Sequence, residues 1–299
     1  MAAEVFKTIG IPREHASLPV NRQAEWYTWS DEFRSLFKSW RSEVEKLPIK
    51  PELRHTLGGQ RYDRTFSLPL SLVGNRALLG ELKKFAQSLY NLEVAGKILL
   101  FSDLLDEDLD GKGLHFLLAV LRELLAQLCG DEACALYAPL GSVGKRRREF
   151  PLHADLYIPE VLFNIFDEIS RDESGKSIFL RFADLQSLMA LVPDVPDKVS
   201  ALIRECTEGS SREDRFERLF TALHREPADW RKELEDAMYN RRLRIKMYSG
   251  QGYLINDRVW LHGREAPRRG ISCRRLHRLI YNTRNLQERR RQWLGEGEH

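Results

Sequence analysis

Three residues of this chain have the types and the spacing of a mononuclear metal centre. The segment PLHADLY places His153 and Asp155 two positions apart, and the segment WLHGR supplies His262 much later in the chain. Two histidines and one carboxylate on one face of an octahedron leave three positions open, which is the arrangement of non-haem Fe(II) oxygenases. The pattern therefore predicts that His153, Asp155 and His262 bind iron and form the catalytic centre.

The His-x-Asp spacing also predicts that these ligands lie on β-strands. Residues two apart in a strand point to the same side, so His153 and Asp155 would face one metal ion together. The spacing alone is common in proteins, and a single histidine on an apolar segment is more often a hydrogen-bonded packing residue. The sequence around the three residues must therefore support the prediction.

The distal histidine lies in a segment that gives this support. It is GYLINDRVWLHGREA, and RRLHRLIYNT follows shortly after it. Together they resemble the end of the taurine dioxygenase and clavaminate synthase-like oxygenases, in which a Gly-x-hydrophobic-hydrophobic-x-Asn/Asp-x-Arg segment precedes the distal histidine ligand. The matching positions are Gly252, Asn256, Asp257, Arg258, His262, Gly263, Arg274 and Arg278.

A second stretch resembles the same family. It is HADLYIPEVLFNIFDEISRDESGKSIFLRFADL, and it is similar to the first ligand pair followed by a strand with proline, a glycine turn and a strand bearing Ser or Thr. The resemblance covers about residues 150–190 and 243–283, and the two blocks occur in the family's order. It does not extend to residues 1–140.

The resemblance implies Fe(II), 2-oxoglutarate as cosubstrate, and O2. The far carboxylate of 2-oxoglutarate needs a buried cation, since a desolvated carboxylate without one is costly, and arginine can bind it with two parallel hydrogen bonds. Arg274 matches the family's cosubstrate arginine, and Ser177 matches a hydroxyl position that assists it. Arg278, four residues further on the same side of a strand, could bind the cosubstrate or an anionic group of the substrate.

The implied activity is that of a dioxygenase, in which an unactivated C–H bond is hydroxylated or otherwise oxidised and succinate and CO2 are released. The family's typical substrates are small polar metabolites, such as amino acids, their derivatives and natural-product intermediates. Related halogenases carry a small residue in place of the carboxylate ligand, so Asp155 argues against halogenation. Desaturation, epimerisation, cyclisation, substrate identity and oligomeric state stay open.

Three alternatives stand beside this prediction, and one of them, a cupin-like metal enzyme without 2-oxoglutarate, is disfavoured by Arg274 together with Ser177. The same chemistry could act on a macromolecule, a nucleic acid or a protein side chain, since eleven arginines fall between Arg258 and Arg291. The net charge is only +3, however, so we expect a small-molecule substrate and not a nucleic acid partner. A non-catalytic binding member of the fold would require a broken ligand set, and all three predicted ligands are present.

Hydrophobic periodicity predicts how these residues are positioned. Helical spacing at residues 31–46, 79–92 and 113–129 predicts a helix-rich N-terminal part over residues 1–140. Strand-like segments form a predicted β core over residues 141–192 and 241–285. These segments are LYIPEVLFNIFDEI, KSIFLRF, LRIKMYS, GYLINDRVWLH and RRLHRLIYNT.

A helical insertion at about residues 193–240 interrupts the predicted core, and its place between the ligand-bearing blocks suggests a lid. Residues 286–299 form a polar tail. The predicted fold class is α+β, with a mainly β core and many helices. The core would be a double-stranded β-helix (a cupin-like jelly roll) within a single oxygenase domain over residues 1–299.

Composition sets outer limits on the class of protein. The chain has 299 residues, of which 42% are hydrophobic and 30% charged, enough for one sizeable core. It contains no run of 18 apolar residues and no signal-peptide pattern at its start, so we expect no membrane association. The four cysteines show no C-x-x-C spacing, which favours a reduced, cytoplasmic setting.

Overall fold

The fold was analysed in a computed structural model. It describes residues 23–35, 39, 53–56, 59–62, 76–77, 80–81, 96–102, 118, 121–122, 134–141, 149–154, 161–169, 175–208, 215–225, 229–266 and 274–281. No helix among these residues is long and apolar enough to cross a membrane.

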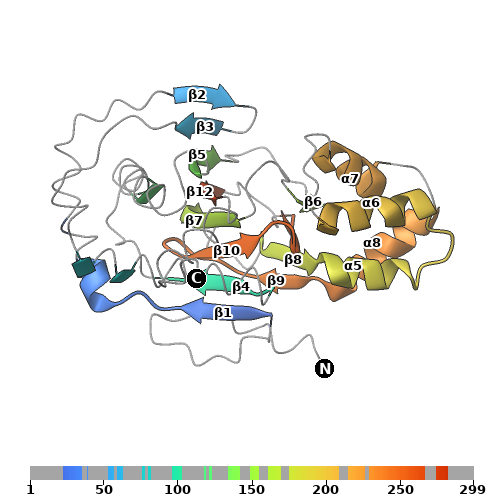
Figure 1. The fold of residues 1–299 in the computed structure, drawn as a ribbon, viewed down its shortest axis with the longest axis horizontal. Helices are drawn as coiled ribbons and strands as arrows, with labels where there is room; N and C mark the ends of the chain where they lie inside the picture. Colours follow the sequence, from blue (N-terminus) through green and yellow to red (C-terminus); the bar gives the residue numbers. More distant parts are fainter. Residues whose placement is uncertain are drawn as a thin grey trace, which may run out of the picture.

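The larger of two β-sheets in the described part of the chain has eight strands, in the spatial order β1-β4-β10-β7-β12-β5-β3-β2 (Figure 1). The pair β1–β4 is parallel and the other pairs are antiparallel, so the sheet is mixed. The strands are β1 (Ala24–Tyr27), β2 (Leu53–Thr56), β3 (Gly59–Tyr62), β4 (Ile98–Phe101), β5 (Cys134–Gly141), β7 (Val161–Ile169), β10 (Gly252–Asn256) and β12 (Arg274–Tyr281).

The smaller sheet has four antiparallel strands in the order β6-β11-β8-β9. They are β6 (Phe150–His153), β8 (Ser177–Arg181), β9 (Leu243–Ile245) and β11 (Trp260–Arg264). The chain crosses between the sheets several times, because in sequence β6 lies between β5 and β7, β8 and β9 lie between β7 and β10, and β11 lies between β10 and β12. Segments that lie far apart in sequence are therefore neighbours in this small sheet.

An apolar core lies between the two sheets and defines the inner face of each. The strands that contribute to it do so with alternate residues, as the period of two in a strand requires. Its buried members are Ala24, Ile98, Leu100, Leu162, Phe166, Phe179, Leu243, Ile245, Met247, Tyr253, Ile255, Trp260 and Leu276. The intervening residues of these strands, such as Leu180, Leu261 and Phe163, lie on the outer faces.

Four helices cover the outer face of the small sheet. They are α5 (Phe182–Met189), α6 (Asp197–Glu208), α7 (Arg215–His224) and α8 (Asp229–Arg241), gathered at one end of the molecule (Figure 1). A second core joins them to the outward side chains of the strands, among them Leu152, Ile178, Leu180 and Leu261. The helices are therefore packed onto the sheet and do not form a separate globule.

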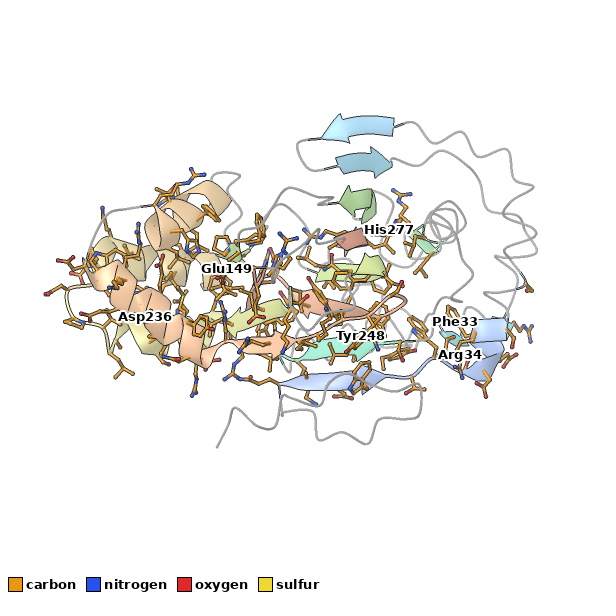
Figure 2. All side chains as sticks on the ribbon, turned by 180° about the vertical axis from the view of Figure 1, so that it is seen from behind. Phe33, Arg34, Glu149, Asp236, Tyr248 and His277 are labelled. Atoms are coloured by element: carbon orange, nitrogen blue, oxygen red, sulfur yellow. The ribbon has the colours of Figure 1, made fainter. Side chains whose placement is uncertain are left out.

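The large sheet has a different cover on its outer face. Phe101 of β4 and Phe163 of β7 stack with ring centroids 4.7 Å apart. Trp29 lies edge-on to Phe101 at 6.2 Å and stacks on Phe33 at 4.9 Å. The chain after β1 thus closes the face of the sheet that points away from the small sheet, and Figure 2 shows Phe33 at the end of the molecule opposite the helices.

The α+β class and the core strands agree with the sequence prediction. All five strand-like segments contain strands, and α6, α7 and α8 fall where the helical insertion was expected. The lid role of that insertion stays a prediction; its described helices pack on the outer face of the small sheet. Most residues of the predicted N-terminal helices, Asp155 and the predicted tail lie outside the described residues.

The N-terminal part differs from the prediction in one respect, since it also supplies strands β1 to β4. The sequence of β4 is ILLF, and all four residues are buried. A strand covered on both faces has no alternation of polar and apolar residues, so its period could not be recognised. The helix-rich description of residues 1–140 was therefore incomplete.

Candidate metal centre

The two predicted histidine ligands are direct neighbours on adjacent strands. His153 ends β6 and His262 is the middle residue of β11, and the two are paired in the antiparallel register. Their ring centroids lie 4.3 Å apart. Both residues are buried, with exposures of 4% and 3%, and both alternate onto the inner face of the small sheet. Two histidines far apart in sequence thus have their imidazole rings next to each other on one face of the sheet.

A local irregularity produces this pairing. His262 pairs with His153 while Arg264 pairs with Phe150, so β6 bulges by one residue beside Gly263. A Cβ at Gly263 would lie 2.6 Å from the carbonyl oxygen of Phe150, closer than real contacts allow. Glycine at this position lets the two ligand-bearing strands approach each other.

The protonation pattern of His153 suits metal binding. Its Nδ1 lies 2.9 Å from the carbonyl oxygen of Pro151. A carbonyl only accepts hydrogen bonds, so Nδ1 carries the proton and donates it. The lone pair of the neutral ring is then on Nε2, the nitrogen that a metal ion would bind. Metal-bound histidines are commonly oriented in this way by a backbone carbonyl.

A carboxylate lies behind His262. The Nδ1 of His262 is 3.3 Å from Oδ1 of Asp257, whose side chain is 1% exposed. A carboxylate on the Nδ1 side orients the ring so that Nε2 faces away from it, which is the arrangement of carboxylate–histidine–metal sites. Asp257 belongs to the turn that connects β10 of the large sheet with β11 of the small sheet, so it lies only five residues before the histidine that it contacts.

The third predicted ligand, Asp155, lies outside the described residues. Among the described residues no group of three His, Cys, Asp or Glu side chains is placed to hold a metal ion. The described histidine pair fits Fe(II) by its donor type, by its spacing and by the contacts that both Nδ1 atoms make with protein oxygens. The predicted centre is thus represented by two of its three ligands.

Two polar residues extend the inner face beyond the histidines. Arg264 follows His262 by two positions, so both project from the same side of β11. Ser177 of β8 is the cross-strand partner of Arg264, and both side chains are buried. Ser177, expected to assist 2-oxoglutarate, therefore lies on the same face as the histidines, beside an arginine that the sequence prediction had not singled out.

The predicted arginines lie on β12 of the opposite sheet. Arg274 begins this strand, and its side chain lies outside the described residues. Arg278 is half-buried and donates from Nε to Oδ1 of Asn164 on β7, at 2.8 Å. Leu276, two positions before Arg278, belongs to the inner core, so alternation points Arg278 towards the small sheet. His277 alternates away from Arg278 and is buried on the other face.

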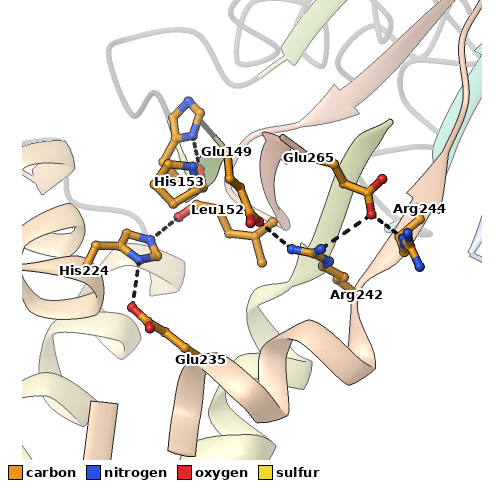
Figure 3. A network of polar contacts seen from close by, with 9 residues as sticks. Glu149, Leu152, His153, His224, Glu235, Arg242, Arg244 and Glu265 are labelled. Atoms are coloured by element: carbon orange, nitrogen blue, oxygen red, sulfur yellow. Dashed lines mark hydrogen bonds and ion pairs between the residues drawn. The ribbon is translucent and has the colours of Figure 1, made fainter. Parts of the chain in front are cut away.

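Helix α7 reaches the ligand strand from behind. His224 at its end donates from Nε2 to the carbonyl oxygen of Leu152, at 2.7 Å (Figure 3). Burial lowers the pKa of His224, and the pull of the Leu152 carbonyl and of Glu235 opposes this only in part. The neutral ring thus binds the peptide next to His153 and ties the helical layer to β6.

An ion-pair network joins the same strands at one edge. Arg242, just before β9, contacts Glu149 before β6 and lies 3.5 Å from Glu265 after β11 (Figure 3). Arg244 of β9 also contacts Glu265. The Arg242 guanidinium lies over the ring of Tyr239 of α8, 4.1 Å from its centroid. Figure 2 shows Glu149 where the helices meet the strands. One buried arginine thus connects three of the four strands.

Comparison with solved structures identifies the architecture. An asparagine oxygenase superposes with a TM-score of 0.51 at 12% identity, covering 88% of this chain and 94% of that chain. The fold is that of an asparagine oxygenase. This agrees, at the level of the fold, with the resemblance to non-haem iron oxygenases seen in the sequence.

Further solved structures match over similar lengths. One is asparagine oxygenase in complex with Fe(II), 2S,3S-3-hydroxyasparagine and succinate, at TM-score 0.48 and 10% identity, covering 86% of this chain and 93% of that chain. Another is the non-heme iron oxygenase OrfP with Fe and alpha-ketoglutaric acid, at TM-score 0.47 and 14% identity, covering 89% and 96%. No family model and no curated protein sequence matches the chain.

Proposed function

We propose that the chain is an Fe(II)/2-oxoglutarate-dependent oxygenase that hydroxylates a small amino acid or amino-acid derivative. The observation that carries the proposal is the cross-strand pair His153–His262, buried on the inner face of the small sheet with its rings 4.3 Å apart. Histidines at this separation, one with Nδ1 bonded to a carbonyl and one backed by a carboxylate, are suited to a shared metal ion.

The residues of the chain have separate tasks in this proposal. His153, Asp155 and His262 would hold Fe(II), and Asp155 would keep the third protein position occupied by a carboxylate. Bound Fe(II) supplies the oxidation of a C–H bond to C–OH by O2, with 2-oxoglutarate converted to succinate and CO2. Arg274 and Ser177 would bind the far carboxylate of 2-oxoglutarate, and Arg278 would bind the cosubstrate or an anionic group of the substrate.

The burial of the site has a chemical consequence of its own. His153, His262 and Ser177 are all at most 4% exposed, so the groups around a bound metal are largely shielded from water. A water-excluding environment strengthens the attraction between arginine side chains and carboxylate ligands, and it limits side reactions of the oxidising centre. The amino-acid substrate class is supported by the shared fold with asparagine oxygenase.

The proposal includes a finer description of the fold and of the partners. The two facing sheets would close into a double-stranded β-helix, with the metal between them, in one oxygenase domain. The substrate would be a small molecule, and a cytoplasmic location follows from the cysteine pattern. The helices between β8 and β9 would act on the site either as the expected lid or through their contacts with β6.

Anaerobic addition of Fe(II) and 2-oxoglutarate tests the proposal. The wild-type protein should develop a weak visible charge-transfer band, and it should release succinate when O2 and a suitable amino acid are admitted. The variant Asp155→Ala should lose both signals. A wild-type protein without the band, and without succinate for any of the twenty common amino acids, would show that the proposed activity is wrong.

A matched variant separates loss of the site from loss of the fold. Leu152→Ala changes the residue next to His153 but on the opposite face, where it contacts the helical layer. This variant should be less stable and still develop the band. Loss of the band in Leu152→Ala at a temperature where its circular dichroism is native would contradict the assignment of the two faces.

A further inference from the structure

One inner-face residue of the large sheet stands out by its chemistry. Asn164 lies in the middle of β7, and the residues two positions before and after it, Leu162 and Phe166, belong to the apolar core. Its exposure is 0%. Burying a primary amide among apolar side chains is unfavourable unless its donors and acceptors are bonded. An asparagine here therefore needs polar partners on this face.

Only one end of the amide has such a partner. Oδ1 of Asn164 accepts a hydrogen bond from Nε of Arg278 at 2.8 Å. Arginine has no acceptor, so this contact fixes which end of the amide carries the oxygen. The other end, Nδ2, is buried and has no hydrogen-bond partner among the residues that the structure describes. Within the described part of the chain, this buried N–H donor is thus available to a ligand.

A chain of contacts relates this amide to the histidine pair. In the small sheet, His262 is the cross-strand partner of Phe179. The ring of Phe179 meets the ring of Tyr253 edge-on, 4.9 Å between centroids, and so bridges the two sheets. In the large sheet, Tyr253 is the partner of Asn164, which is also the partner of Arg278. The histidines and the Asn164–Arg278 pair therefore lie at the same level between the sheets.

The order of the strands in each sheet shows which strand of the small sheet lies opposite Asn164. Phe179 of β8 packs in one core with the apolar inner residues of β4, β9 and β10. Next to β8 in the small sheet is β11, and next to β10 in the large sheet is β7. Going one strand further from the Phe179–Tyr253 contact brings His262 opposite Asn164, across a spacing of roughly 10 Å, which is usual for packed sheets.

We propose that Asn164 is a ligand-binding and positioning residue of this site. It holds the guanidinium of Arg278 through Oδ1 and donates Nδ2–H to a carboxylate bound between the sheets. An amide N–H and a guanidinium offer donors and positive charge, and a carboxylate offers only acceptors and negative charge, so the two surfaces are complementary. The inference rests on the proposed function and adds a second donor to the arginine that this function assigns.

The carboxylate could belong to 2-oxoglutarate or to the amino-acid substrate, and two measurements separate them. The first is an anaerobic titration of the Fe(II)-loaded protein with 2-oxoglutarate, followed by the charge-transfer band. The second is the melting temperature of the Fe(II)/2-oxoglutarate complex with each of the twenty L-amino acids. Asn164→Leu removes the amide at similar size, and Asn164→Asp keeps the acceptor for Arg278 but replaces Nδ2 with a carboxylate oxygen.

Both variants should weaken carboxylate binding by about 10- to 100-fold, the effect of losing a hydrogen bond to a charged group. A loss in the 2-oxoglutarate titration assigns Asn164 to the cosubstrate, and a loss confined to amino-acid stabilisation assigns it to the substrate. Leu162→Ala, on the same face and strand, should lower the melting temperature without changing either affinity. This control separates a binding role from a packing role.

Three results would overturn the inference. Unchanged 2-oxoglutarate affinity in Asn164→Leu, together with the same amino-acid stabilisation as in the wild type, would show that the residue only packs. Wild-type carboxylate affinity in Asn164→Asp would show that Nδ2 does not donate to the ligand. A wild-type protein without the charge-transfer band would remove the proposed function and this inference with it, which distinguishes that failure from a failure of Asn164 alone.

Discussion

The two faces of the four-stranded sheet are made by the same strands and have opposite characters. The inner face carries His153, His262, Ser177 and Arg264, while the outer face carries apolar side chains that pack against α5 to α8. Consecutive residues such as Leu261 and His262 therefore belong to different environments. Since successive side chains of a strand point to opposite faces, a single register fixes both the polar site and its apolar support.

The comparison shows how a polar site can be held rigidly. A buried histidine pair needs fixed backbones on both strands, and polar side chains contribute little cohesion of their own. The outer core supplies that cohesion, and the contact of His224 with the Leu152 carbonyl ties it to the ligand strand. The inner face thus carries the residues of the proposed site, and the outer face supplies the packing that stabilises their strands.

The largest effect is expected from substituting neighbours on β11. His262→Ala removes a proposed ligand, and it should reduce succinate formation by more than about 100-fold, beyond the 10- to 100-fold usual for changing a ligand's outer partner. Leu261→Ala leaves a cavity in the outer core and should lower the free energy of unfolding by about 2–5 kcal/mol with turnover retained. Denaturant unfolding and succinate assays measure both.

The two substitutions are each other's control. Equal losses of turnover at a temperature where both variants are folded would break the distinction between the faces. A large loss of stability in His262→Ala would have the same consequence.

A smaller effect is expected behind the ligand. Asp257→Asn keeps the size of the side chain and removes the charge 3.3 Å from Nδ1 of His262. Iron affinity should fall by about 10- to 100-fold, as it does when the partner of a ligating histidine is changed. Equilibrium dialysis with Fe(II) under nitrogen measures it. Wild-type affinity in Asp257→Asn would show that the carboxylate does not orient the ring.

Substitution of Gly263 should affect both the stability of the fold and iron binding. In Gly263→Ala the new Cβ meets the backbone of Phe150 and Pro151, so β6 must move away from β11. We expect a loss of about 1–3 kcal/mol in stability, as in other overpacked sites, together with weaker iron binding. Gly80→Ala, where nothing lies within 4 Å, should leave both unchanged or raise stability slightly. Similar losses in the two variants would contradict this explanation.

The smallest effect concerns pH and the outer face. Burial lowers the pKa of His224, so the unfolded chain binds a proton there more readily than the folded one. Stability should therefore decrease as the pH falls below about 6.5, the ordinary histidine pKa, towards the lower folded value. His224→Gln, which can still donate to Leu152, should lose this component. Unfolding curves from pH 7.5 to 5.5 compare the two proteins, and identical slopes would refute the assignment.

The histidine pair was predictable because two independent signals coincide in sequence. Alternation explains the His-x-Asp spacing, and the glycine, asparagine and arginine positions around His262 match a family pattern. Gly252 also has a physical reason, since a Cβ there would lie 2.2 Å from the backbone oxygen of Asn164. A close backbone contact of this kind requires glycine, so it is visible in the sequence as a glycine of the motif.

Other parts of the site could be recognised only with partial signals. Arg264 shares the face of His262 by the same rule of two, so alternation could have identified it. Asn164 is a single polar residue within the apolar run VLFNIF, which suggests a special role without naming it. Asp257 belongs to the matched motif, but its closeness to His262 depends on the geometry of the turn.

The remaining features depend on contacts that no local pattern encodes. His224 and Leu152 are 72 positions apart, and their hydrogen bond follows from the packing of α7 on the small sheet. Strands β1 and β4 are similarly set by their position in the sheet, and ILLF carries no periodicity of its own. Tertiary packing, and not local propensity, decides these elements.

The central claim is that the inner face of the small sheet binds the metal and the outer face provides stability. Measuring the iron bound by variants at two neighbouring residues of β6 tests it most directly. Wild-type protein, His153→Ala and Leu152→Ala would each be equilibrated with Fe(II) under nitrogen, and bound iron would be measured per chain. The division of the two faces predicts one iron per chain in the wild type and in Leu152→Ala, and none in His153→Ala. Wild-type iron content in His153→Ala, or the loss of iron in folded Leu152→Ala, would contradict it.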